Sequence, residues 1–386
     1  MEDDYHLKQR LEDINRKMVE DIKAATDKIN QKINLTKEEL KKCIEKKKNY
    51  YKEINNLRKI PHLQVDFSPN QDINYIINPV LVCLANLEVI FKFCFGDEKQ
   101  KILIKINNLA PQSFLIYFMY LMKDMRDENV INPNYMDLHF YLRNPVLKLN
   151  YNSQDPSYWI KIILEQLEIN IDLLKENDIS NIITNNFKLI LITKEQCSFC
   201  QTIDIIYPEE EKICLDLYLK SPRPDDNNHE KKILIDNSIF DSLLLKFDEQ
   251  NLNKKCNICG EKLITTKRIK NLKNYLILNI NRDEEKEGKM DLEYSQILKI
   301  TDEETKVEIQ YELISALTNI NVNSNNEDNR NNYVLYLKHF INNKWFRWES
   351  AFNDNIENVF IEKKPNLLIY KKMKNNIQDN QNIPQQ

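Results

Sequence analysis

The chain has 386 residues, 42% of them hydrophobic and 30% charged, so it is long enough to bury the core of one large domain or two smaller ones. Its formal net charge of −4 argues against a role that depends on bulk electrostatic attraction to nucleic acid. No apolar run approaches the ~20 residues of a membrane span and the acidic start at Glu2 is unlike a signal peptide, so we expect a protein of the cytosol or nucleus.

The first 62 residues are expected to form a helical arm. Apolar residues recur three and four positions apart from Leu7 to Ile29, which is the spacing of one helix face. The run Thr36–Glu39 matches a capping box and predicts a break, after which a second helix begins. Two interpretations stay open. The arm packs on the body of the protein, or its narrow apolar stripe is a coiled-coil arm that docks on a partner.

The rest of the chain is expected to be an α+β body. Residues 74–95 and 111–125 are apolar enough for buried helices, and residues 158–177 have the pattern of an amphipathic helix. Three prolines in residues 131–157 predict an irregular insertion. Residues 376–386 are expected to be a disordered tail. Five β-type runs follow residue 186: Phe187–Ile192, Ile213–Leu219, Tyr275–Ile280, Val334–Leu337 and Leu367–Tyr370.

Four of the eight cysteines form two Cys-x-x-Cys pairs, Cys197 with Cys200 and Cys256 with Cys259. Two such pairs can complete the tetrahedron of one structural Zn²⁺, with no position left open for catalysis. The alternative is four unrelated core thiols. Polar neighbours at residues 194–196 and 253–255 favour exposed knuckles at strand tips. The other four cysteines lie in apolar patterns that indicate packing: Cys43, Cys83, Cys94 and Cys214.

Five segments resemble ubiquitin-specific proteases, in the order that this family has them. They are NQDINYIINPVLVCLANL (70–87), ISNIITNNFKLILITKEQCSFCQT (179–202), the run from Lys267 to Arg282, YELISALTNINVN (311–323) and NNYVLYLKHFINNKWFRWES (331–350). The likeness covers roughly residues 66–372. It implies a papain-like thumb and palm with zinc-knuckle β fingers at about 190–280, all within a domain at 63–375 that follows the arm at 1–62.

The resemblance also places the family's catalytic residues. It puts Tyr75 at the nucleophilic cysteine, Asn70 at the oxyanion-stabilising asparagine, Asn332 at the general-base histidine and Glu349 at the residue that orients the histidine. A phenol is a poor nucleophile for an isopeptide, and an amide cannot accept the proton. Cys83 lies two helical turns past Tyr75, and His339 lies seven residues along the strand from Asn332. We therefore expect degenerate catalytic positions, that is, a pseudoenzyme.

Three functions follow from these expectations. The first is a catalytically inactive scaffold or subunit of a larger intracellular complex, with protein partners, one structural zinc ion and weak ubiquitin binding at most. The second is a module that binds ubiquitin without hydrolysing its conjugates. The third, an active cysteine-type deubiquitinase, conflicts with the residues at positions 75 and 332.

Overall fold

The computed structural model describes residues 2–57, 74–127, 136–150, 153–175, 182–206, 208–218, 233–235, 255–281, 292–302, 304–320, 332–349, 351–356 and 365–373. Contacts divide the chain into two compact units, Met1–Lys59 and Ile60–Gln386.

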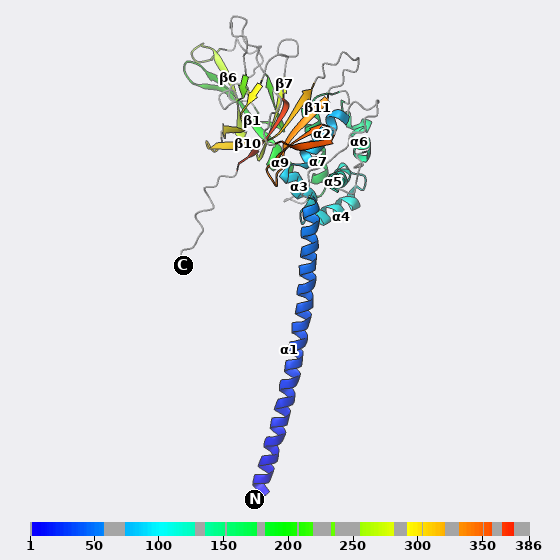
Figure 1. Ribbon diagram of the computed structural model, residues 1–386. Coiled ribbons are helices and arrows are strands. Elements are labelled where there is room, and N and C mark those ends of the chain that lie inside the picture. Colours follow the sequence, from blue (N-terminus) through cyan, green and yellow to red (C-terminus); the bar gives the residue numbers. More distant parts are fainter. Residues whose placement is uncertain are drawn as a thin grey trace. The chain divides into compact units, whose positions relative to one another are not determined.

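The first unit is a single helix, α1 (Glu2–Leu57), drawn in blue in Figure 1. The predicted break at Thr36 is wrong. The Thr36 hydroxyl donates to the carbonyl of Lys32, four residues earlier, at 3.0 Å, so it bonds within the helix rather than capping a new one. Thr26 donates to Ile22 in the same way, at 2.8 Å. Because α1 contains no glycine or proline, nothing in its sequence interrupts the backbone hydrogen bonds.

The second unit begins with a helical lobe. Its helices are α2 (Asn74–Ala85), α3 (Glu88–Phe95), α4 (Lys99–Leu109), α5 (Phe114–Asp124), α6 (Met136–Leu142), the 3-10 helix η1 (Pro145–Leu147), α7 (Pro156–Asp172) and α9 (Ile182–Phe187). The start of α7 is capped by Asp155, which accepts from the Ser157 amide at 2.8 Å, with Pro156 in the first turn.

The structure confirms buried helices in the apolar run 74–95, where α2 and α3 meet at 75°. The insertion expected to be irregular contains α6 and η1, so that prediction is wrong in part. In the part of the chain that is described, no single helix is both long and apolar enough to cross a membrane. The bent pair α2–α3 meets that length and composition test, and most of its apolar side chains lie in the core.

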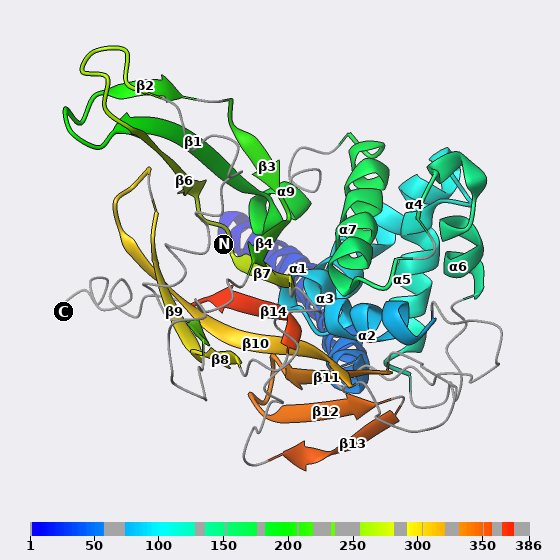
Figure 2. The same ribbon diagram turned by 90° about the horizontal axis from the view of Figure 1, so that it is seen from above.

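The remaining chain forms sheets, shown in Figure 2. The finger sheet has the order β2-β1-β3, with β6 also paired to β1; its strands are β1 (Leu189–Cys197), β2 (Ile203–Ile206), β3 (Glu210–Lys212) and β6 (Leu263–Asn271). The central sheet has the order β13-β12-β11-β10-β14-β7-β4, with β9 paired to β10. Its strands are β4 (Cys214–Tyr218), β7 (Tyr275–Asn281), β9 (Ile297–Thr301), β10 (Glu308–Ile320), β11 (Asn332–Lys338), β12 (Trp345–Glu349), β13 (Ala351–Ile356) and β14 (Pro365–Lys372). Strands β5 (Ile233–Ile235) and β8 (Leu292–Tyr294) form a separate parallel pair.

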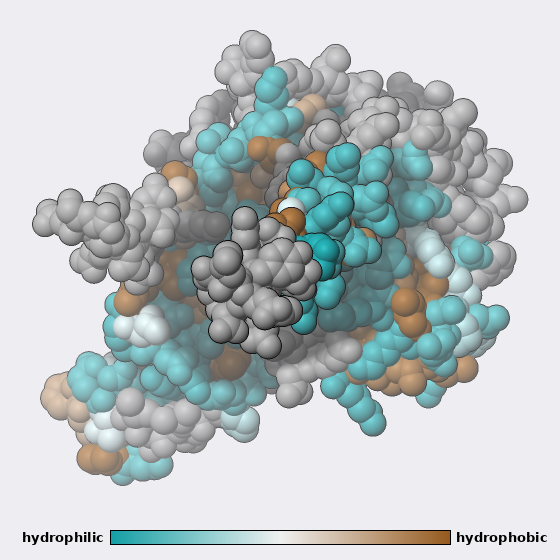
Figure 3. Space-filling model, turned by 90° about the horizontal axis from the view of Figure 1, so that it is seen from below, coloured by the Kyte–Doolittle hydropathy of each residue, from teal (hydrophilic) through white to brown (hydrophobic). Residues whose placement is uncertain are grey.

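Buried residues lie where the central sheet meets the helical lobe, and a further buried cluster joins strands of the finger and central sheets. Strand β7 is buried along Tyr275–Ile280, because β4 and β14 flank it and α9 covers it through the stacked rings of Phe187 and Tyr275. All five predicted β-type runs contain strand residues, although Phe187 itself ends α9. On the face shown in Figure 3, hydrophobic residues form small groups separated by hydrophilic ones.

Candidate functional site

Helix α2 runs alongside strand β11 and is fixed to the sheet near its C-terminal end. The Asn86 amide, just past that end, donates to the carbonyl of Lys338 at 2.9 Å. One turn earlier, the buried Cys83 thiol donates to the Ser315 hydroxyl at 3.3 Å, and Ser315 donates to the carbonyl of Tyr336 at 3.1 Å. The end of α2 therefore meets the end of β11, and the two elements run in the same direction.

This alignment brings two of the predicted catalytic positions to the same end of the pair. A helix rises about 1.5 Å per residue, so Tyr75 lies roughly 17 Å before Asn86. A strand rises about 3.4 Å per residue, so Asn332 lies roughly 20 Å before Lys338. Strand β12 returns antiparallel to β11, and Glu349 directly follows Trp348, which pairs with Leu335.

At these three positions the structure describes the backbone and not the side chains, and Asn70 lies outside the described residues. Tyr75 is in the first turn of α2, Asn332 begins β11 and Glu349 ends β12. Pro79, inside α2, has no N–H to donate to the carbonyl of Tyr75. The first turn of α2 therefore has weaker internal support than the anchored end of the helix.

Cys83 and His339 carry a thiol and an imidazole, and both side chains are buried. Burial raises the pKa of Cys83 to about 12, so its thiol stays protonated at neutral pH. His339 is buried just past the far end of β11, seven strand residues or about 24 Å from Asn332. The His339 amide donates to the carbonyl of Lys344 at 2.8 Å, closing the turn, and its ring packs edge-on against Phe346. Both residues serve packing.

The four cysteines of the two pairs meet at the end of the finger sheet. The first pair begins at Cys197, the last residue of β1, which pairs directly with Leu263 in the ladder. The second pair precedes β6. Backbone amides of Phe199 and Cys200 donate to the Cys197 sulfur, each at 3.4 Å, and that of Ile258 donates to the Cys256 sulfur at 3.4 Å. Each pair therefore folds into a tight turn around its first thiol.

These turns need unusual backbone conformations. Gln201, directly after the first pair, has φ +60°, and Gly260, directly after the second, has φ +74°. Glycine adopts a positive φ without steric cost, so Gly260 suits its turn. Sequence reasoning placed polar, exposed residues around the knuckles. Glu195 departs from this, because it is completely buried in the finger sheet.

The sulfur positions fit a tetrahedral metal ion. The Sγ atoms are separated by 3.3 Å for Cys197–Cys259, 3.6 Å for Cys200–Cys259 and 3.7 Å for Cys200–Cys256, and all four lie within 4.8 Å of one another. A tetrahedron with Zn–S bonds of about 2.3 Å has S–S edges of about 3.8 Å. Hydrogen bonds with Thr202 lower the pKa of Cys200 to about 6. The Glu261 backbone amide lowers the pKa of Cys259, but contacts with the other three thiols raise it to about 12. The proximity predicted for these cysteines is confirmed.

The remaining cysteines were predicted to be packing residues, and three of them are buried: Cys83, Cys94 and Cys214. The prediction is wrong for Cys43, which is exposed on α1. A single helix has no interior of its own in which an apolar pattern could bury the thiol.

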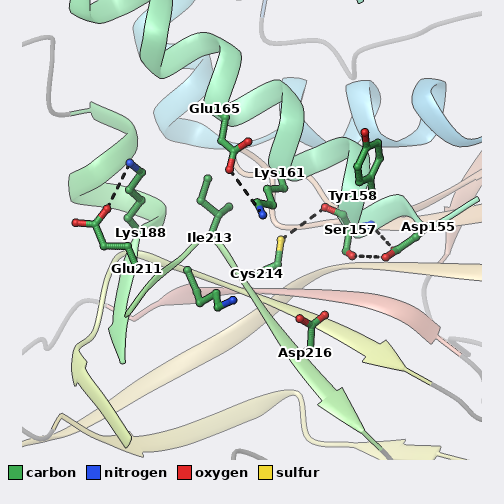
Figure 4. Close-up of a pocket in the computed structure, with 11 residues that line it drawn as sticks. Asp155, Ser157, Tyr158, Lys161, Glu165, Lys188, Glu211, Ile213, Cys214 and Asp216 are labelled. Carbon is green, nitrogen blue, oxygen red and sulfur yellow. Dashed lines mark hydrogen bonds and ion pairs between the residues drawn. The ribbon is translucent and has the colours of Figure 1, made fainter. Parts of the chain in front are cut away.

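A charged cleft of about 410 Å³ lies between α7 and the strands β3 and β4 (Figure 4). Its charges are largely paired, with Lys188 between Glu168 at 2.6 Å and Glu211 at 3.6 Å. Burial raises the pKa of Cys214, whose thiol lies 3.9 Å from the carbonyl of Ser157. The lining residues include no histidine and no accessible thiol, so this cleft does not assemble thiol-protease chemistry.

A family model described as ubiquitin carboxyl-terminal hydrolase matches residues 70–370. The chain belongs to this family. The match confirms the family that the sequence resembles. Members of this family are cysteine-type deubiquitinases. No curated protein matches the sequence closely enough to be reported.

Solved structures confirm the ubiquitin-specific protease fold, and the N-terminal helix expected beside it is α1. A SAGA DUB module of Ubp8, Sgf11, Sus1 and Sgf73 bound to monoubiquitin matches with a TM-score of 0.62 at 17% identity, over 82% of this chain and 70% of that chain. A yeast SAGA DUB module with a mutant Sgf73 gives 0.59 at 16%, over 82% and 69%. An essential yeast splicing factor gives 0.55 at 15%, over 81% and 69%. At these identities the likeness establishes the fold alone.

Proposed function

We propose that this protein is a non-hydrolysing member of its family that serves as a subunit of a larger protein assembly. The observation that carries the proposal is the residue pair Tyr75 and Asn332, where the family's thiol and imidazole would stand. A thiol protease needs a thiolate and a base that titrates near neutral pH. A phenol and an amide provide neither. The buried Cys83 and the distant His339 do not restore them.

The rest of the fold supports a role in binding other proteins rather than in hydrolysis. The finger sheet, the central sheet and the four-cysteine cluster are all present, and we propose that the cluster holds one structural zinc ion. Structures similar to the body come from a DUB module with three partner proteins and from a splicing factor. We propose protein partners of that general kind in the cytosol or nucleus, with α1 as a contact element.

The proposal is tested with ubiquitin conjugates and with a ubiquitin probe that traps active-site cysteines. We expect no labelling and no turnover above background, which places the rate at least about 10⁴-fold below that of an active family member used as positive control. The variant Cys83→Ala should behave like the unmodified protein. Labelling that maps to Cys83, or turnover that Cys83→Ala abolishes, would show that the nucleophile had been misplaced.

Restoring the two residues should not restore the enzyme. The variant Tyr75→Cys with Asn332→His is expected to remain close to background, because Asp72 and Asn331 replace glycines that flank both boxes in the family. Recovery of a large part of the family's activity would instead show that the two side chains alone are limiting.

Removing residues 1–60 tests the role of α1 as a contact element. We expect the remaining body to fold and keep its metal, because its contacts form a compact unit of their own, but to lose the partners that co-purify with the full chain. Retention of all partners would place docking on the body. Binding of free ubiquitin by the body at low micromolar affinity would favour the ubiquitin-binding alternative.

A further inference from the structure

The apolar residues of α1 repeat every 11 positions. Leu7, Met18, Ile29, Leu40 and Tyr51 form one series, and Leu11, Ile22, Ile33 and Ile44 form a second that lies four residues later. A third series, seven residues after the first, contains Ile14, Ala25, Thr36 and Lys47. Eleven residues in three turns give about 3.67 residues per turn, close to the 3.6 of a straight helix. The three series therefore form one stripe along the whole helix, called the α1 stripe below.

The α1 stripe is exposed where its side chains are described. Met18, Ile22, Ile29, Ile33, Leu40 and Ile44 are each 44–60% exposed. Val19 and Leu35 are exposed too but lie off the stripe. A regular apolar stripe of this length on a charged helix has the pattern of a seam that packs against another helix.

Charge differs between the two halves of α1. Residues 2–27 contain eight acidic and five basic side chains, whereas residues 28–57 contain nine basic and four acidic ones. Two copies that pair in parallel would bring basic half against basic half. Two antiparallel copies would instead bring each acidic half against a basic half. Packed helices lie about 8–10 Å apart, and at this distance salt screens the attraction between opposite charges only in part.

The α1 stripe is also self-complementary when reversed. If a two-fold axis passes by Ile29, residue i of one copy lies beside residue 58 − i of the other. Stripe residues then face stripe residues throughout: Ile29 faces itself, Met18 faces Leu40, Ala25 faces Ile33 and Ile14 faces Ile44. Lys47 lies beside Leu11 near the seam's end. In a parallel pair, Lys47 would instead face its own copy inside the seam.

We propose that α1 is an antiparallel homodimerisation helix, and that the occupant of the α1 stripe is a second copy of this chain. The inference rests on the role of α1 as a contact element in the proposed function and makes the assembly at least two-fold. Because each chain continues from the C-terminal end of its own α1, the two bodies follow from opposite ends of the paired helices.

The oligomeric state of the full chain provides the first test. Sedimentation at micromolar concentration should give twice the 46.3 kDa mass of one chain. Ile29→Lys places two lysines against each other at the axis and should weaken the dimer roughly 100-fold or more. The matched control is Gln31→Lys, two residues away and on the opposite face of α1, which should remain dimeric. A monomeric unmodified chain, or equal effects of the two variants, would overturn the proposal.

Cross-linking decides the orientation. In the antiparallel pair the two Cys43 thiols lie about 42 Å apart, so a short bis-maleimide should not join them. Lys17 and Cys43 each directly precede a stripe residue and share one flank of the stripe. Lys17→Cys should therefore cross-link to Cys43 of the other copy, as mapped by peptide analysis, whereas Lys17→Cys combined with Cys43→Ser should not. A Cys43-to-Cys43 cross-link would establish parallel pairing and overturn the proposal.

These outcomes are separable from those of the hydrolysis assay. A monomer without hydrolytic activity would contradict the proposed dimer and agree with the proposed lack of activity. A dimer that hydrolyses ubiquitin conjugates would agree with the proposed dimer and contradict the proposed lack of activity.

Discussion

Purified protein is expected to contain one zinc ion per chain, and Cys256→Ser is expected to lose it. The end of the finger sheet has little else to hold it together, since its buried cluster consists of Cys197, Cys256 and Leu263 with Cys200 packed against it. Structural zinc contributes an apparent ~10–16 kcal/mol in small zinc modules, far more than one leucine can. Elemental analysis measures the metal. Hydrogen exchange should show faster exchange at the adjoining ends of β1 and β6, with the central sheet unchanged.

Ser198→Ala is the matched control, because Ser198 lies between Cys197 and Cys200 of the other pair, but its hydroxyl donates to the carbonyl of Lys262 and offers no sulfur. This variant should keep its zinc. A metal content near zero in reduced, undamaged, unmodified protein would contradict the assignment of the cluster as a zinc site.

Arg126→Met is expected to lower the free energy of unfolding by about 2–4 kcal/mol. The Arg126 guanidinium is buried, donates to the carbonyl of Ala85 at the end of α2 and lies 4.9 Å from the ring centre of Phe91. It also lies 5.8 Å from the ring centre of Phe340. Burial lowers its pKa to about 10, so it remains charged at neutral pH. Methionine fills the volume but leaves the carbonyl of Ala85 without this donor.

Urea denaturation measures the effect of this substitution. Lys123→Met, three residues earlier and exposed, is the control and should change stability by less than about 0.5 kcal/mol. Arg126→Lys should fall between the two, because an ammonium cannot stack as a planar guanidinium does. A loss below about 0.5 kcal/mol for Arg126→Met would show that the aromatic contacts contribute little.

Sequence patterns predicted the elements whose burial is uniform. The run Tyr275–Ile280 is apolar except for Asn279 because β7 is buried along this whole stretch, and a short, almost continuous apolar run is typical of a buried strand. The spacing within each cysteine pair likewise predicted the four-cysteine cluster. Local patterns failed where two structures compete for the same residues. Thr36 has the sequence of a cap, yet the surrounding helix formers keep its hydroxyl within the helix.

The placement of the positions that the family resemblance assigns to catalysis could not be derived from local pattern. It depends on the contact of Asn86 with Lys338, which are 252 residues apart, and on the contact of Cys83 with Ser315, which are 232 apart. Only the family resemblance suggested that these segments meet. Arg126 was missed because a lone arginine after an apolar helix carries no signal, and a buried role becomes visible only once three separate elements surround it.

The anchoring of α2 at one end has an evolutionary consequence. Its described hydrogen bonds to the sheet come from Cys83 and Asn86, about 12–17 Å along the helix from position 75. Selection for folding and selection for chemistry therefore act on different residues of the same helix. A lineage that no longer needs the thiol can exchange it while the anchors, and with them the architecture, persist. In such a fold, substitutions can abolish catalysis without unfolding the protein.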